Sequence, residues 1–409
     1  MRCRHCGAEV TLELVDLGTA PPSNGFLTRE ALRHPEPWLP LRVLVCERCW
    51  LAQTEDFIRP DELFAPDYAY FSSYSSAWLE HAERYVDDAV GRFGLGPNSL
   101  VVEVAANDGY LLQYVQARGI PSLGIEPTAS TAAAARERGI RVIEEFFGSN
   151  VADGLARDGQ QADLLIANNV LAHVPDINDF VNGFTRLLKP NGVATFEFHH
   201  LQRLVDGCQF DTMYHEHFSY LSLTAVDRIL ASAGMSVFDV EGLETHGGSL
   251  RVFAQRSDSG AQPRTASVAA LLGAEEAAGM RSPAYYTGFG ERVVKVKHEF
   301  LAFLLDAHAS GSTVAGYGAA AKGNTLLNYA GVRPDLVAFV ADRNPAKQGR
   351  FLPGSRIPVV SEDDLREAQP DFVVIFPWNL RDEVANQLAY VSGWGGRFVT
   401  AVPTLHTWG

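Results

Sequence analysis

Val101-Val102-Glu103-Val104-Ala105-Ala106-Asn107-Asp108-Gly109 is the stretch that decides the fold. Its first half is a short apolar run, which predicts a buried strand, and its second half is a polar turn that ends in glycine. A helical pattern follows over residues 110–118. A strand that turns directly into a helix is typical of the carboxyl edge of an α/β sheet, where such proteins bind their ligands.

The same alternation continues beyond this stretch. Further strands are predicted over residues 123–125, 142–147, 163–167 and 193–198. A helix is predicted over residues 129–138. The last two apolar runs, residues 235–241 and 249–254, have no helix between them, so we expect an antiparallel pair at one edge. The segment 98–256 is therefore predicted to form a doubly wound, mostly parallel sheet.

Polar side chains end three of the predicted strands. They are Glu103, Asp108 and Gly109 around the first turn, Glu126 after the second strand and Asn168 after the fourth. Because the carboxyl ends of parallel strands meet at one edge of a sheet, we expect these groups to line one crevice.

This order of elements resembles the class I S-adenosylmethionine-dependent methyltransferase fold. The resemblance implies S-adenosylmethionine as cofactor and S-adenosylhomocysteine as its product. The family's first turn is glycine-rich, whereas here only Gly109 remains, after two alanines. Acidic side chains suit a sulfonium and an amino group, and Glu126 can accept hydrogen bonds from a ribose diol. NAD carries the same ribose, so Glu126 indicates an adenosine cofactor without naming it.

Tyr214-His215-Glu216-His217-Phe218-Ser219-Tyr220 is the densest polar cluster of the chain, and we call it the 214–220 motif. It lies between the fifth strand and a helical pattern over residues 221–233, so we expect it on a loop at a strand end. Burying such groups unpaired costs roughly 2–7 kcal/mol each. A histidine beside a carboxylate is the usual general base near neutral pH. The alternative is a hydrogen-bonded polar loop without catalytic role.

Two CxxC pairs, Cys3/Cys6 and Cys46/Cys49, lie within residues 1–60. Four thiolates complete a tetrahedral zinc shell and leave no open position, so the predicted site is structural. A redox-active CxxC is the alternative, but no thioredoxin-like unit is visible around either pair. Cys208 is interpreted as a small buried hydrophobic residue.

The segments on either side of the core have their own signatures. Residues 61–97 form a connector with a run of aromatic side chains over residues 68–74, which either packs on the next domain or closes over a ligand as a lid. Residues 275–409 predict a separate Rossmann-like α/β domain, with a long helix over 286–309 and strands over 313–317, 336–340, 373–377 and 398–402.

The turn Gly316-Tyr317-Gly318-Ala319-Ala320-Ala321-Lys322-Gly323 follows the first strand of this last domain. With Asp342 after the next strand it allows a nicotinamide site, although Ala321 stands where the third glycine of that motif belongs. Lys322 at a helix N-terminus favours an anion instead. We assign Lys322 and Tyr317 to the binding of a phosphorylated substrate.

Composition limits the partners of this 409-residue chain. Its net charge of −15 argues against nucleic acid or an anionic membrane surface as partner. No apolar run is long enough to cross a bilayer, and the N-terminus carries no secretory signal. We expect a cytoplasmic monomer whose substrate is a small molecule.

The three parts together resemble the bacterial nucleotide-sugar C-methyltransferases. The resemblance implies that a base removes a proton beside the keto group of an NDP-4-keto-6-deoxy sugar, and that the enolate takes a methyl group at C3, or at C5 in some relatives. It assigns Glu216 and His217 to the base, with His217 as proton acceptor, and Tyr214, Tyr68 and His173 to the sugar. It also implies zinc on the four cysteines. An NAD-dependent sugar-modifying enzyme and a zinc-knuckle scaffold with a degenerate core are the alternatives.

Overall fold

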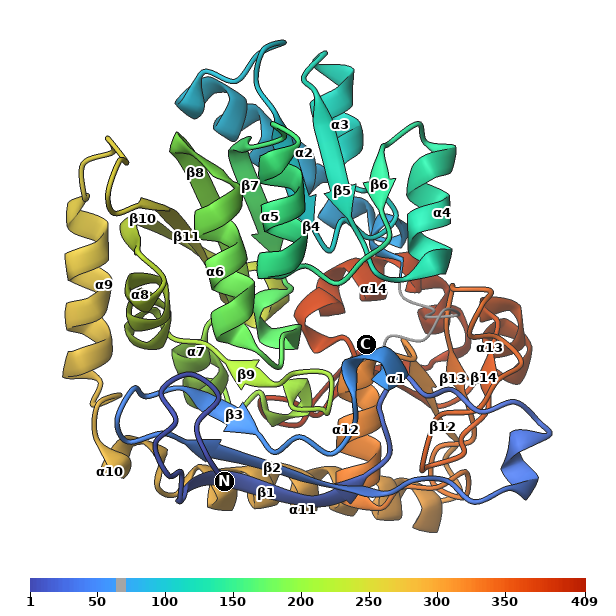
Figure 1. Cartoon of the computed structure of the whole chain (residues 1–409). Coiled ribbons are helices and arrows are strands. Elements are labelled where there is room, and N and C mark those ends of the chain that lie inside the picture. The colour runs from blue at the N-terminus through green and yellow to red at the C-terminus, as the bar shows by residue number, and fades with distance from the viewer. Residues whose placement is uncertain (64–70) are drawn as a thin grey trace.

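The computed structural model describes residues 1–63 and 71–409. Three β-sheets build the molecule, and Figure 1 shows the largest above the N-terminal sheet, with the C-terminal sheet at the side. Tyr68 lies outside the described residues. No helix in the described part of the chain is both long and apolar enough to cross a membrane.

The seven-stranded sheet confirms the predicted core. Its order is β10-β11-β8-β7-β4-β5-β6. Its strands are β4 Val101–Val104, β5 Ser122–Ile125, β6 Val142–Ile143, β7 Ala162–Asn168, β8 Leu188–His199, β10 Met235–Leu243 and β11 Ser249–Arg256. β4 to β8 are parallel, whereas β11 runs antiparallel to both β8 and β10.

Helices cover both faces of this sheet, because alternate strand residues are apolar on both sides. Val101 packs with the helices of one face, and Val102 with those of the other. The first set is α2 Ser76–Phe93, α3 Leu112–Ala117 and α4 Ala129–Glu137. The second set is α5 Ser149–Arg157, α6 Ile177–Leu187, α8 Leu223–Ser232 and α9 Ala266–Ala277.

Two predicted strands are shorter than expected. β6 covers only the start of residues 142–147, because it is the edge strand and Phe146 after it is exposed. β13 Val340–Ala341 replaces the predicted 336–340, since the amides of Leu336 and Val337 donate to the carbonyl of Arg333 in a turn.

The N-terminal sheet takes its last strand from the middle of the chain. β1 Leu12–Ala20, β2 Leu39–Val45 and β3 Ala52–Thr54 are joined by β9 Ser219–Tyr220, in the order β1-β2-β3-β9. The 214–220 motif therefore does not leave β8 directly as expected. The chain first forms α7 Leu201–Asp206 and a short 3-10 turn, Phe210–Thr212.

The C-terminal sheet has six strands in the order β14-β13-β12-β15-β16-β17. Besides β13 these are β12 Val314–Tyr317, β14 Val359–Val360, β15 Phe372–Ile375, β16 Arg397–Thr400 and β17 His406–Trp408. The short helices α13 Glu362–Ala368 and α14 Arg381–Gln387 lie on one face. On the other face, α11 Phe289–Ala309 and α12 Ala321–Ala330 share one hydrophobic core with the N-terminal sheet.

Candidate active site

The turn after β4 adopts a strained backbone that is tied to the end of β5. Ala105 and Asn107 both have positive φ, 56° and 50°, in the region that favours glycine. The amides of Ala105 and Ala106 donate to the carbonyl of Ile125 in β5 at 2.7 and 3.2 Å. Strained backbone residues cluster at functional sites.

Gly109 closes this turn for a packing reason. Its φ is 78°, and a Cβ added there would lie 2.3 Å from the Cδ1 of Ile140. Such a distance is a collision, so glycine lets α3 approach the neighbouring helix–strand unit.

Buried polar oxygens lie near the ends of β4 and β7. Both carboxylate oxygens of Glu103 and the amide oxygen of Asn168 are buried, and the phenol of Tyr110 is the hydrogen-bonding group beside them. Burial raises the pKa of Glu103 well above its usual value, with smaller contributions from the charges of Glu126 and Asp108.

Glu126 is placed to hold a diol. Its carboxylate accepts from the amides of Asn107 and Thr128, each at 2.9 Å. The hydroxyls of Thr128 and Thr131 lie beside the same carboxylate, so a ribose diol would have to share it with them. Burial raises the pKa of Glu126, while the bonds to Thr128 and Asn107 act in the opposite direction.

Asp108 joins the turn after β4 to the segment before α2. Its carboxylate accepts a short hydrogen bond from the hydroxyl of Ser73 and forms an ion pair with Arg138 at 3.1 Å. The amide of Ser72 donates to the side chain of Asn107 at 2.9 Å. Residues 71–75 are thereby fixed above the turn.

His217 has a defined tautomer. Its Nδ1 lies 2.8 Å from the carbonyl oxygen of Thr212. A carbonyl can only accept, so Nδ1 carries the hydrogen and Nε2 keeps the lone pair. No hydrogen bond reaches Nε2 from the described residues. Burial, reinforced by the neighbouring imidazole of His173, lowers the pKa of His217 well below its usual value, so the ring is neutral at pH 7.

The other residues of the motif surround this ring unevenly. The ring centroids of Tyr214 and His173 lie 4.0 and 4.6 Å from that of His217. Glu216 instead accepts from the side-chain amide of Asn24 at 2.8 and 2.9 Å, in the N-terminal domain. The group that holds the ring of His217 is thus the Thr212 carbonyl, whereas Glu216 ties the motif to Asn24.

Several residues that the sequence analysis missed lie around the same place. His199 at the end of β8 donates to Gln209 at 2.6 Å, and His246 lies 3.3 Å from the amide of Asn169. Burial lowers the pKa of His199 to about 3 and that of His246 to about 4. His246 and Asn169 both have positive φ, 55° and 52°. This positive φ is the feature that marks the two residues, and φ cannot be read from a sequence.

Lys322 reaches these histidines from the C-terminal domain. After burial, its charge also contributes to lowering the pKa values of His199, His217 and His246. The ammonium donates to Asn379 at 2.8 Å and lies 4.5 Å from the ring centroid of Trp378. Burial lowers its own pKa to about 8.

Tyr317 is not brought to this cluster. Its hydroxyl donates to Glu362 at 2.5 Å and accepts a short hydrogen bond from Gln387. Its ring packs with α13 and α14, on the face of the sheet opposite Lys322. The two residues of the predicted substrate site are therefore separated by the sheet.

Family comparisons match consecutive parts of the chain. A zinc binding domain model covers residues 3–64, a methyltransferase domain model residues 78–240, and a C-methyltransferase C-terminal domain model residues 244–403. C-methyltransferase NovU of Streptomyces niveus is 35% identical over 402 residues, 98% of this chain and 95% of NovU. The chain belongs to the C-methyltransferase family.

More distant proteins match less than half of this C-methyltransferase. A ubiquinone biosynthesis O-methyltransferase of Chelativorans sp. (strain BNC1) is 24% identical over 178 residues, 38% of this chain and 69% of that protein. Magnesium protoporphyrin IX methyltransferase from Synechocystis PCC 6803, solved with S-adenosylhomocysteine, has a TM-score of 0.36 at 16% identity, covering 44% of this chain and 83% of that one. That structural similarity is too low to bear on the site.

The enzyme is an S-adenosylmethionine-dependent C-methyltransferase, and its crevice fits this cofactor. The buried oxygens of Glu103 and Asn168 share one phenol, that of Tyr110, and can accept from an ammonium group, and the carboxylate of Glu126 can accept from a ribose. Glu103, Asp108 and Glu126 are all carboxylic, which disfavours a pyrophosphate at the same turn.

The four cysteines fit zinc. The Sγ atoms of Cys3, Cys6, Cys46 and Cys49 all lie within 4.8 Å of one another, as in no other set of potential ligands among the described residues. Cys3 to Cys49 and Cys6 to Cys46 are 3.5 Å apart, close to the edge of about 3.8 Å that a tetrahedron with Zn–S bonds near 2.3 Å requires. Gln53 donates to the Sγ of Cys3 at 3.3 Å, as a thiolate ligand needs.

The glycine turn of the C-terminal domain is filled by the chain itself. A Cβ on Gly316 or Gly323 would strike Phe376 at 2.5 or 2.6 Å, and one on Gly318 would strike Pro377 at 2.6 Å. The Asp342 carboxylate accepts the amide of Ala319 at 2.7 Å. These glycines permit close packing between strand, helix and loop. Packing therefore explains the glycines, and a dinucleotide-binding site is not needed to explain them.

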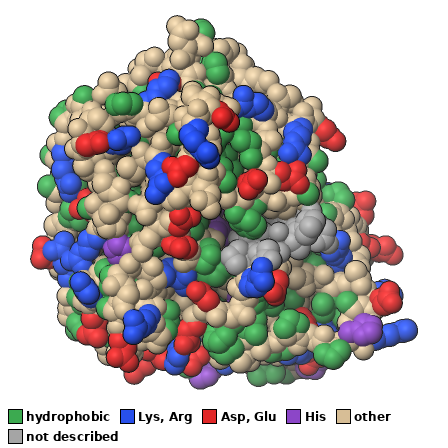
Figure 2. Space-filling view, viewed as in Figure 1, with side chains coloured by type: hydrophobic (Ala, Val, Ile, Leu, Met, Phe, Trp, Pro, Cys, Tyr) green, Lys and Arg blue, Asp and Glu red, His purple; other side chains and the backbone are tan. Residues whose placement is uncertain are grey.

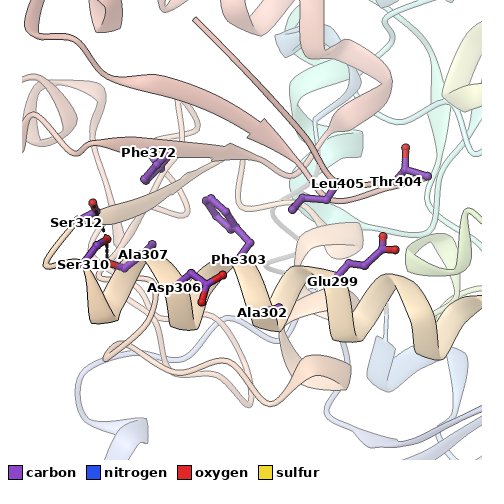
Figure 3. A pocket seen from close by; sticks show the side chains of 10 residues that line it. All are labelled: Glu299, Ala302, Phe303, Asp306, Ala307, Ser310, Ser312, Phe372, Thr404 and Leu405. Carbon is purple, nitrogen blue, oxygen red and sulfur yellow. Dashed lines mark hydrogen bonds between the residues drawn. The ribbon is translucent and has the colours of Figure 1, made fainter.

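An open groove of about 760 Å³ lies elsewhere on the C-terminal domain (Figure 3). It runs along α11, beside Glu299, Phe303 and Asp306, towards Phe372 and Leu405. It contains none of the predicted site residues.

The surface in Figure 2 shows acidic and basic side chains interspersed. On that face the net charge of −15 therefore does not form a single acidic patch.

Proposed function

We propose that this C-methyltransferase methylates C3 of an NDP-4-keto-6-deoxy sugar, beside the keto group, by way of an enolate. The observation that carries the proposal is the state of His217. Its Nδ1 is held by a carbonyl, its ring is neutral, and it lies against Tyr214 and His173. That is the arrangement of a general base with a fixed accepting atom.

In the proposed reaction, Nε2 of His217 takes the proton from the carbon next to the ketone. The imidazolium that forms keeps its second hydrogen bond to Thr212, so the ring does not turn during the step. The low pKa of the buried ring makes it a weak base, so the developing oxyanion must be stabilised as well. Donors aimed at an oxyanion typically contribute about 10²–10³ in rate each.

Tyr214 is the described phenol that can supply such a donor, since its ring lies 4.0 Å from that of His217. Tyr68 is assigned to the same role by the family resemblance. His173 lines the sugar, with its pKa lowered to about 4 by burial, so it binds as a neutral ring. S-adenosylmethionine supplies an electrophilic methyl group, and the chain's contribution to its transfer is alignment.

Lys322 binds the anionic part of the substrate in this proposal. It stands in the first turn of α12, where the helix dipole also favours negative charge. The effect of its charge on the pKa values of His199, His217 and His246 supports a place on the same side of the molecule as the proposed base. Tyr317 is left out of the substrate site because its hydroxyl is bound to Glu362 on the far face.

The test is to incubate the enzyme with S-adenosylmethionine and a panel of dTDP-, GDP- and CDP-linked 4-keto-6-deoxy sugars, and to locate the new methyl group by NMR. We expect it on C3. A methyl group on C5 would support the other branch of the family. Hydride transfer to NAD without methylation would refute the proposal.

His217→Asn should abolish methylation of the active sugar and leave the affinity for S-adenosylmethionine unchanged. His215→Asn is the matched control, because the ring of His215 in the same motif bonds to the carbonyl of Pro40, away from His217. An active His217→Asn enzyme would contradict the assignment of the base.

A further inference from the structure

The strand β3 connects the zinc-binding cysteines to the 214–220 motif. On one side it pairs with β2, and the Cys46–Cys49 turn is the link between these two strands. On the other side it pairs with β9, with Ala52 opposite Tyr220 and Gln53 opposite Ser219. β9 begins two residues after His217, so one short strand lies between the metal ligands and the base.

Thr54, the last residue of β3, holds the backbone of the motif with two hydrogen bonds. Its hydroxyl donates to the carbonyl of His217 at 3.1 Å, and its amide donates to the carbonyl of Phe218 at 3.2 Å. Thr54 is only 3% exposed. Together with the bond from His217 to Thr212, these contacts fix the base from its backbone and from its ring.

Gln53, the neighbour of Thr54, is bound to the first cysteine turn. Its side-chain amide donates to the Sγ of Cys3 at 3.3 Å, and its side-chain oxygen accepts from the amide of Arg4 at 2.9 Å. Gln53 is fully buried. A displacement of Cys3 is therefore transmitted to β3 and from there to the motif.

The same cysteine turn holds the segment that carries His173. The guanidinium of Arg4 donates to the carbonyls of Pro175 and Thr54, both at 2.9 Å. His5 and Asn178 also exchange hydrogen bonds, at 2.8 and 2.9 Å. Pro175 and Asn178 lie two and five residues after His173.

We propose that the metal-closed cysteine cluster positions the catalytic histidine, and that Thr54 is the positioning residue that passes this constraint to His217. The zinc takes no part in the chemistry. It fixes the Cys3 turn and the Cys46–Cys49 turn, and β3 transfers that rigidity to the base. The inference rests on the proposed function, because His217 must be the base for its position to matter to turnover.

The size of the effect follows from positioning. A misplacement of about 1 Å in a catalytic group can lower a rate by about 10²-fold. Thr54→Val keeps the shape and the amide bond and removes only the hydroxyl bond. We therefore expect kcat to fall about 10- to 100-fold, with an unchanged Kd for S-adenosylmethionine.

Two variants make the comparison specific. Thr54→Ser keeps the hydroxyl and should restore most of kcat. Ser219→Ala removes a buried hydroxyl that has no hydrogen-bond partner, on the strand that pairs with β3, and should behave as wild type. The visible spectrum of the Co²⁺-substituted proteins reports whether the four-thiolate site is intact, and it should be the same in all of them.

The direct readout is the imidazole nitrogen resonances of His217 in ring-¹⁵N-labelled protein, assigned with His217→Asn. We expect these resonances to shift in Thr54→Val and not in Ser219→Ala. A Thr54→Val enzyme with wild-type kcat and unchanged His217 resonances would overturn the inference. If wild type acts on no keto sugar, the proposed function fails, and the resonances still decide whether Thr54 holds His217.

Metal exchange gives the same test if Thr54→Val does not fold. Replacing Zn²⁺ by the larger Cd²⁺ in the wild-type protein should shift the resonances of His217 and leave those of His308 on α11 unchanged. Resonances of His217 that do not respond to the metal would overturn the inference.

Discussion

His217 shows how far a single residue can be predicted. The 214–220 motif identifies it as a candidate catalytic residue from the sequence alone, because a short core strand would not carry such a mixture of imidazoles, phenols and carboxylate. Its partner could not be predicted in the same way. The acceptor is the backbone carbonyl of Thr212, and a backbone group carries no sequence signal. Glu216, the obvious neighbour, is bound to Asn24.

The buried histidines predict a pH-dependent stability. The pKa values of His173 and His246 are lowered to about 4, and that of His199 to about 3, from 6.5. The unfolded chain therefore binds more protons than the folded one below pH 6.5, and stability is lost as pH falls. At pH of about 5.5 each such histidine lowers the free energy of unfolding by about 1 kcal/mol.

Urea unfolding at pH of about 7.5 and about 5.5 measures this loss. The difference between the two free energies should be smaller in His199→Asn than in wild type by about 1 kcal/mol. An equal difference in both proteins would show that His199 titrates normally in the folded state.

Lys322 predicts the alkaline limit of activity. Burial lowers its pKa to about 8, so its charge is present below that pH and lost above it. If Lys322 binds an anion, kcat/KM should fall as pH rises through about 8. Lys322→Met should raise KM at neutral pH and remove that alkaline limb from the profile. If the alkaline fall in kcat/KM persists in Lys322→Met, another group causes it.

At the scale of elements, periodicity predicts the core sheet and fails at the edges. Buried parallel strands such as β4 and β7 are apolar on both faces, so their sequence signal is strong. β6 and β13 are two-residue strands, and their extent depends on the neighbouring strand. β9 could not be predicted at all, because it pairs with β3 across more than half of the methyltransferase core.

Substitution of Gly109 tests the turn that follows β4. Gly109→Ala places a side chain at a φ of 78° and against Ile140. The left-handed backbone should lower the free energy of unfolding by about 1–2 kcal/mol, and the collision should lower it further. Gly119→Ala has a similar φ of 68° with nothing within 4 Å, and it isolates the backbone term.

We expect Gly109→Ala to unfold at lower urea than Gly119→Ala and to bind S-adenosylmethionine more weakly. Calorimetric titration and urea unfolding measure the two effects. Equal stability of the two variants would mean that Ile140 moves aside without strain.

At the scale of the whole molecule, the domains read from the sequence are not independent bodies. One hydrophobic core joins the N-terminal sheet to α11 and α12, and another joins the cysteine turns to the helices of the methyltransferase core. The sequence shows the apolar residues of each segment, but it does not show which segments share them. For the same reason, the sequence does not show that the C-terminal sheet separates Lys322 from Tyr317.

Loss of the metal should therefore destabilise the whole chain. Cys46→Ser removes one of four thiolates, and structural zinc contributes directly to folding free energy. We expect its near-ultraviolet circular dichroism to be lost at a lower temperature than in wild type, in a single transition. A Cys46→Ser protein that folds normally but is inactive would mean that the zinc is not structural.

Proton removal by His217 is the central claim, and hydrogen exchange measures it without methyl transfer. The enzyme is incubated in D₂O with the accepted keto sugar and S-adenosylhomocysteine, and NMR follows the hydrogen on the carbon beside the ketone. The hydrogen should exchange with wild type and with His215→Asn, and should be retained with His217→Asn. Exchange at the wild-type rate with His217→Asn would contradict the account.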